Sequence, residues 1–221
     1  MQLMQKESEV SRIRGARKVG LGALLVGLAV ACTPPPPPSA ATVALEGRLL
    51  TEADVGSGFA EESRGRAGVS GGMICPEADF ETADVGVVRV AFVRGSGRDE
   101  IGLDQVLRVA EQGELDRLFV GMRDAYEACF GVVWTDYGDT RMVEPLMIPE
   151  VGDDRIAVHA VRGDPPFDGR HDDDRGVIVR SGDILIEITV SEVHDSAQTP
   201  PSLGDEEFLG IVAKALEKLT G

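Results

Sequence analysis

Apolar residues change their spacing along the middle of this chain. The run at residues 87–93 is β-branched and ends at Gly95-Ser96-Gly97, which predicts a strand. From residue 112 to residue 129 the apolar positions recur at intervals of three, four and seven, which predicts a helix with one buried face. That face comprises Leu115, Leu118, Phe119, Met122, Tyr126 and Cys129.

The second half of the chain predicts further strands. Residues 156–161 and 177–180 are apolar runs, and the polar stretch from 163 to 175 between them indicates a loop. Residues 143–148 contain Pro145, so they form an edge strand at best.

The last predicted strand follows a tight turn. Ser181-Gly182 leads into residues 184–190, and the two together indicate a hairpin. The isoleucines of this run alternate with Glu187 and Thr189, which predicts one dry face and one wet face, as an antiparallel sheet allows.

Helices are expected at both ends of the folded part. Residues 51–54 place a capping Thr three positions before an acid, which predicts a short helix start. After Pro200-Pro201, a final helix presents an apolar face of Phe208, Leu209, Val212, Ala215, Leu216 and Leu219. The expected fold is α+β, with an antiparallel sheet flanked by two main helices, 112–129 and the C-terminal one.

The N-terminus has the pattern of an export signal. Basic residues precede an apolar run from Val19 to Ala31, which is shorter than the roughly 20 residues of a spanning helix. Cys32 follows directly, and Ala29-Val30-Ala31-Cys32 resembles a bacterial lipobox, although its first position usually holds Leu. The same residues fit ordinary signal cleavage, and an uncleaved segment is a third alternative. We expect a signal peptide at 1–31, a lipidated Cys32 with a Pro-rich tether at 32–48, and one domain at 49–221.

The net negative charge of the chain after residue 31 limits the kinds of molecule that it can bind. Without residues 1–31 the chain has 17 basic and 36 acidic residues, a net charge near −19. We therefore expect no nucleic-acid partner, and an anionic membrane surface would repel the domain, so membrane attachment is expected through the lipid alone.

Two cysteines remain if Cys32 carries lipid. In an exported protein, Cys75 and Cys129 most simply form one disulfide, with a free thiol pair as the alternative.

Motifs for catalysis are weak. Gly68-Val69-Ser70-Gly71-Gly72 matches G-x-S-x-G, but polar residues precede it where a buried strand is needed, so a glycine-rich loop is the better interpretation. His159, His171 and His194 have no zinc spacing, and we predict neither a metal nor a cofactor. Asp168, Asp172, Asp173 and Asp174 surround His171 in what we interpret as a solvated acidic loop, with weak calcium binding as the alternative.

A further polar group follows the helix at 112–129. Asp136, Asp139 and Arg141, near Trp134 and Tyr137, form either the mouth of a polar cleft or an ordinary loop.

Five segments in this order carry a family resemblance: 49–59, Cys75, 126–129, 152–154 and 179–184. Their order resembles the extracellular sensor domain of PknH-type mycobacterial kinases and the free-standing lipoproteins that carry it. A PsbP-like lipoprotein fold would have the same order of elements. The resemblance implies a curved antiparallel sheet, a cleft for an extracellular signal and no catalytic residues. Family members commonly have a second disulfide, for which this chain lacks cysteines.

These observations together predict a cell-surface lipoprotein with a non-catalytic sensing domain. The unidentified partner is a small ligand or an envelope protein, and the expected ligand is neutral or cationic. The candidate binding residues are Glu187, Thr189, Trp134, Tyr137 and Arg141. A cell-envelope hydrolase using Ser70 or an Asp–His pair, and a structural envelope protein, are the alternatives.

Overall fold

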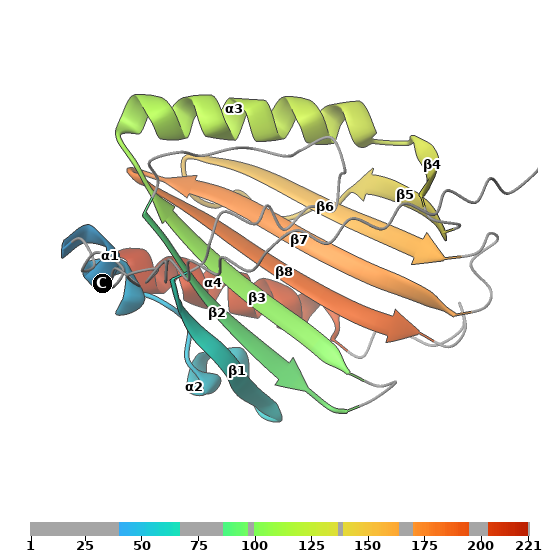
Figure 1. Ribbon diagram of the computed structural model, residues 1–221, viewed down its shortest axis with the longest axis horizontal. Helices are drawn as coiled ribbons and strands as arrows, with labels where there is room; N and C mark the ends of the chain where they lie inside the picture. The colour runs from blue at the N-terminus through green and yellow to red at the C-terminus, as the bar shows by residue number, and fades with distance from the viewer. Residues whose placement is uncertain are drawn as a thin grey trace, which may run out of the picture. The chain divides into compact units, whose positions relative to one another are not determined.

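The computed structural model describes residues 40–66, 86–96, 100–136, 139–163, 170–194 and 203–220. These residues belong to one compact unit, Pro37–Gly221. Its centre is an eight-stranded sheet in the order β1-β2-β3-β8-β7-β6-β5-β4 (Figure 1). Every neighbouring pair is antiparallel. The strands are β1 (Phe59–Arg66), β2 (Gly86–Arg94), β3 (Ile101–Val109), β4 (Val133–Asp136), β5 (Asp139–Pro145), β6 (Asp154–Gly163), β7 (His171–Ser181) and β8 (Ile184–His194).

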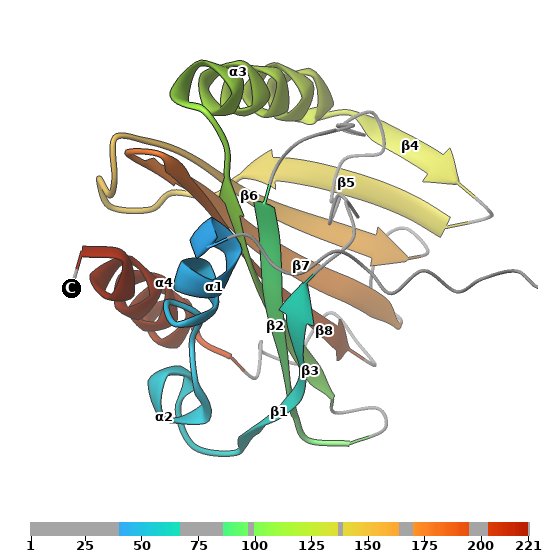
Figure 2. The same cartoon turned by 60° about the vertical axis from the view of Figure 1, so that its left-hand side comes forward.

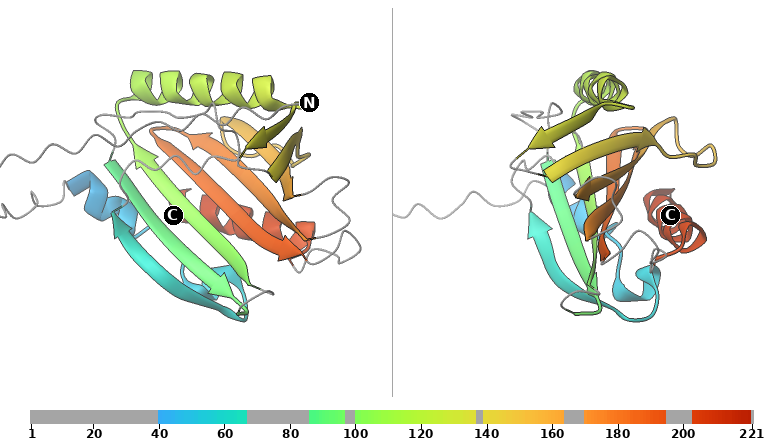
Figure 3. Two further views of the ribbon diagram at one scale, coloured as in Figure 1. Left: turned by 45° about the vertical axis from the view of Figure 1, so that its right-hand side comes forward. Right: turned by 90° about the vertical axis from the view of Figure 1, so that its right-hand side faces the viewer.

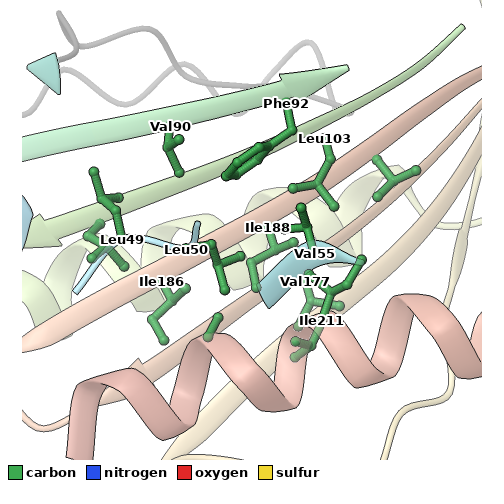
Figure 4. Close-up of a cluster of buried hydrophobic side chains, with 14 of the residues drawn as sticks. Leu49, Leu50, Val55, Val90, Phe92, Leu103, Val177, Ile186, Ile188 and Ile211 are labelled. Carbon is green, nitrogen blue, oxygen red and sulfur yellow. The ribbon is translucent and has the colours of Figure 1, made fainter. Parts of the chain in front are cut away.

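Three helices pack on one face of the sheet, which we call the α4-side face. They are α1 (Ala40–Glu46), α2 (Glu52–Val55) and α4 (Asp205–Thr220), and Figure 2 shows them gathered on the same side. Side chains from all three join strand residues in the larger apolar core, where Leu49, Leu50, Val90 and Phe92 meet Ile186 and Ile188 (Figure 4). This core fixes the position of α4 against β7 and β8.

The opposite face, which we call the α3-side face, is partly covered by α3 (Gln112–Cys129). A second apolar cluster joins Leu115, Phe119 and Met122 of α3 to Ile156 and Ile178 of the sheet. Figure 3 shows α3 and α4 on different sides of the strands. The sheet is thus sandwiched between two layers of helix, and α3 covers only the part of its face next to this cluster.

Several sequence predictions are confirmed. The helix at 112–129 has the predicted bounds, and its apolar face is buried, including Cys129. The short helix start at 51–54 is α2, where the Thr51 amide donates to Asp54 Oδ2 at 2.8 Å. The strands at 87–93, 156–161, 177–180 and 184–190 all lie within strands of the antiparallel sheet.

The loop predicted at 163–175 is wrong from His171 onward, and its residues 164–169 lie outside the described part of the chain. Strand β7 begins at His171, and the acidic run 172–174 pairs in register with β6 and β8. Asp173 is buried rather than solvated, because basic side chains of other strands and of β7 itself surround it. Asp168 lies outside the described residues.

The edge strand predicted at 143–148 is also wrong. Strand β5 ends at Pro145 and is covered on its outer side by β4, which is the edge of the sheet at this end. Pro145 is tolerated because it is the last residue of the strand.

The number of helices differs from the two main ones expected, because four lie in the described residues. Helix α1 occupies residues of the expected tether, and its Leu45 is buried in the larger core. None of the helices in the described ranges has the length and apolar character needed to cross a bilayer.

Candidate functional site

The strand register places the candidate residues of β8 on the α3-side face. Glu187 pairs with Ile178, which pairs with Ile156, and both isoleucines contact α3. Side chains alternate along a strand, so Thr189 two residues on lies on the same face. Leu185 of β8 also belongs to the α3 cluster, whereas its neighbours Ile184 and Ile186 belong to the α4-side core.

Glu187 is not the wet position that the sequence indicated. Its side chain is 4% exposed and accepts a hydrogen bond from Arg108 Nη2 at 2.9 Å, and Arg108 is equally buried. Burial raises the pKa of Glu187, although the Arg108 charge opposes the rise. Desolvation therefore outweighs attraction in this pair, as buried ion pairs often show.

A second ion pair lies beside the first but is open to solvent. Arg89 Nε donates to Asp104 Oδ1 at 2.6 Å, and their side chains are 43% and 36% exposed. Asp104 stands opposite Thr189 of β8, which is half-buried. Polar groups of β2, β3 and β8 thus form one continuous charged patch.

The patch continues towards the outer strands. Ser191 Oγ donates to Asp174 Oδ1 at 2.6 Å, and Arg162 Nε donates to Asp172 Oδ2 at 2.9 Å. Burial raises the pKa of Asp174, and the charge of Asp172 acts in the same direction. The charge of Arg141 opposes that rise, so Arg141 is close enough to act on this carboxyl.

We call this group of side chains the α3-side polar face, in which the Arg108–Glu187 pair is buried and the other members are partly exposed. It unites four basic side chains, four acidic ones and two hydroxyls from β2, β3, β5, β6, β7 and β8. Its residues are Arg89, Asp104, Arg108, Arg141, Arg162, Asp172, Asp174, Glu187, Thr189 and Ser191.

Of the other residues singled out from the sequence, some lie in the β4–β5 hairpin and some lie outside the described residues. Trp134 of β4 stands opposite Arg141 of β5, and Asp136 stands opposite Asp139 at the end of the same hairpin. Across the sheet, the strand pairing places Arg141 of β5 on the same face as Thr189 of β8. Tyr137, Cys32, Cys75 and the Gly68–Gly72 loop with Ser70 fall outside the described residues.

Several residues of the polar face were missed by the sequence analysis. Arg108 and Asp104 belong to β3, which was not predicted, although its apolar residues Ile101, Leu103 and Leu107 alternate with polar ones. The alternation is interrupted at Gln105, whose buried side chain accepts a hydrogen bond from the Leu50 amide. Arg162 was not singled out, and Asp174 was assigned to an acidic loop, because the sequence does not indicate that the two residues share a face of the sheet.

A serine–histidine pair does not form on this face within the described part of the chain. Ser191 has a carboxylate as its partner, and the three histidines lie on the α4-side face. The groups on the polar face can therefore hold a ligand through hydrogen bonds and charge. In the same described residues, no group of three or more His, Cys, Asp or Glu side chains is arranged to hold a metal ion.

Comparison with known proteins identifies a similar fold. No protein-family model matches the sequence, and no curated protein matches it either. Among solved structures, the crystal structure of the extracellular domain of PknH from Mycobacterium tuberculosis is similar, with a TM-score of 0.51 and 9% sequence identity. The match covers 78% of this chain and 93% of that chain. This chain therefore has a fold similar to that of an extracellular kinase domain.

Proposed function

We propose that this chain is a cell-surface lipoprotein whose domain binds an extracellular ligand or envelope partner without catalysing a reaction. The observation that carries the proposal is the fold that it shares with the extracellular domain of PknH. The basic residues and apolar run within residues 1–31 have the pattern of an export signal, which supports an outward-facing location. Lipid on Cys32 would hold the domain at the membrane surface.

The α3-side polar face is the proposed contact surface. Arg89, Asp104 and Arg162 are more than one third exposed there, so a ligand can reach charges of both signs. The opposite face is occupied by three helices and the larger core. The mature chain is strongly acidic, which favours neutral or cationic ligands over anionic ones.

Binding can be tested with a panel of polyamines, amino acids and neutral sugars, using the thermal shift of the whole protein. A ligand that raises Tm should lose most of its effect in Asp104→Asn. The matched control is Glu217→Gln, which removes a charge from another exposed ion pair, Lys214–Glu217 on α4. Equal loss in both variants, or an effect of a cationic ligand that does not weaken as salt rises, would argue against this contact surface.

The lipid anchor is tested separately. Cys32→Ser should move the protein from the detergent phase to the aqueous phase, and the wild-type N-terminal peptide should carry a diacylglyceryl mass. Membrane association that persists unchanged in Cys32→Ser would mean that another feature anchors the chain.

A further inference from the structure

The three histidines of this chain gather on the α4-side face, although they are far apart in sequence. His171 of β7 pairs directly with His194 of β8, and their ring centroids are 5.3 Å apart. His159 of β6 stands opposite Arg175 of β7. His171 and His194 are buried, whereas the His159 side chain is 33% exposed, so His159 can exchange protons with solvent most readily.

His159 forms an ion pair with a mostly buried carboxylate. Its Nε2 lies 2.9 Å from Asp173 Oδ2. The hydrogen bond to Asp173 raises the pKa of His159 in spite of its partial burial. Burial opposes ionisation of Asp173, but the hydrogen bond and the charges of His159, Arg175 and His194 outweigh it, so the pKa of Asp173 is lowered.

Arg175 is shared among three carboxylates. Its Nη2 donates to Glu192 Oε1, its Nη1 donates to Asp205 Oδ1 at 3.1 Å, and its Nε lies 3.7 Å from Asp173 Oδ1. The last two atoms, Arg175 Nε and Asp173 Oδ1, are buried and have no hydrogen-bond partner. The guanidinium is therefore displaced from Asp173 towards Glu192 and Asp205. The hydrogen-bond partner of Asp173 is instead His159.

The same arginine holds the start of α4. Asp205 is the first residue of that helix, and the Arg175 guanidinium lies over the Phe208 ring at 5.6 Å. The Leu203 amide donates to Glu192 Oε1 at 3.3 Å, which ties the residues before the helix to the same cluster. Of the three acids around Arg175, Asp205 is the most exposed, at 75%, so water can replace Arg175 there at the lowest cost.

We propose that His159 is a proton-sensing site, and that loss of its proton loosens the start of α4. With His159 charged, Asp173 has its own cation and Arg175 remains on Glu192 and Asp205. With His159 neutral, the buried Asp173 charge draws Arg175 Nε into contact. Because Arg175 then satisfies Asp173 and the buried Glu192, its contact with the exposed Asp205 is the one that weakens.

The direction of the pH effect follows from the two shifts. The raised pKa of His159 means that its contribution to stability is complete below the ordinary histidine value of 6.5 and is lost as the pH rises through the raised value. The lowered pKa of Asp173 means that its contribution is lost only in acid, as the pH falls through that value. In the described residues, the ionisable groups that face the cluster are Glu144 of β5, His159 of β6, His171, Asp173 and Arg175 of β7, Glu192 and His194 of β8, and Asp205 of α4.

Amide hydrogen exchange tests the coupling directly. The Phe208 amide donates to Gly204 O in the first turn of α4, and the Ala215 amide further along the helix serves as an internal reference. The protection of Phe208 relative to Ala215 should fall roughly two- to fivefold as the pH rises from below the ordinary histidine value of 6.5 through the raised pKa of His159. The titration of His159 itself is followed from its ring proton resonance.

Three variants separate this site from its neighbours. His159→Gln should show the lower relative protection at every pH, and Asp205→Asn should remove the pH dependence. His171→Gln should retain it, because the proposed effect arises from the hydrogen bond between His159 and Asp173, whereas the His171 ring lies beside that of His194. Relative protection that stays constant in the wild type while His159 titrates would overturn the proposal, and so would a pH dependence that survives in His159→Gln or disappears only in His171→Gln.

Discussion

Replacing Glu187 with leucine should lower the free energy of unfolding by about 3–5 kcal/mol, because it leaves Arg108 buried without its counter-charge. Both side chains of the pair are 4% exposed, so water cannot take the place of the missing carboxylate without opening the face. The volume of leucine fills much of the space of the glutamate side chain, so the loss reports the stranded charge rather than a cavity.

The neighbouring pair provides a matched control on the same face. Arg89 and Asp104 also join β-strands through one carboxylate, but they are 43% and 36% exposed. Asp104→Leu should therefore cost no more than about 1 kcal/mol, because solvent hydrates the remaining arginine. The difference between the two single variants isolates the effect of burial.

A double variant tests the cause. Since burial raises the pKa of Glu187 in spite of Arg108, the pair itself contributes little net stability. Arg108→Met combined with Glu187→Leu removes both charges, and it should return the protein to within about 1 kcal/mol of the wild type or above it.

Urea unfolding at neutral pH measures the free energy of unfolding of the wild type and the three variants. The reasoning would be refuted if Glu187→Leu cost no more than Asp104→Leu. It would also be refuted if the double variant were as unstable as Glu187→Leu, because the penalty would then come from packing instead of charge.

Two further predictions concern covalent and backbone constraints. A non-reduced digest of the exported protein should contain a peptide pair linked through Cys75 and Cys129, and Cys129→Ser should lower stability by about 2–4 kcal/mol; two freely alkylated thiols would contradict the pairing. Gly152→Ala should cost more than about 2 kcal/mol, because φ is +64° and a Cβ would lie 2.6 Å from Arg180 O. Gly182→Ala, at a φ of +61° with no atom within 4 Å of the added Cβ, should cost only about 1 kcal/mol, and equal losses in chemical denaturation would contradict the role of the close contact.

The elements with regular apolar spacing could be predicted from the sequence. Helix α3 has the predicted bounds, and the β7–β8 hairpin turns at the predicted place, because a helix face and a two-residue turn are local properties. Strand β1 carries no such signal, since seven of its eight residues are exposed or half-buried. It is a strand because β2 supplies its hydrogen-bond partners.

Whether a charged residue is buried or exposed could not be predicted from the sequence, because it depends on the tertiary structure. The run from Asp172 to Asp174 has the composition of a loop, but β7 continues through it because Asp173 meets His159 and Arg175 in the folded protein. Glu187 alternates with isoleucines and was therefore interpreted as solvent-facing, whereas Arg108, 79 residues away, allows it to be buried. Hydrophobic spacing along a strand determines which residues share a face. Whether a charge on that face is covered or exposed depends on partners that only the complete sheet brings together.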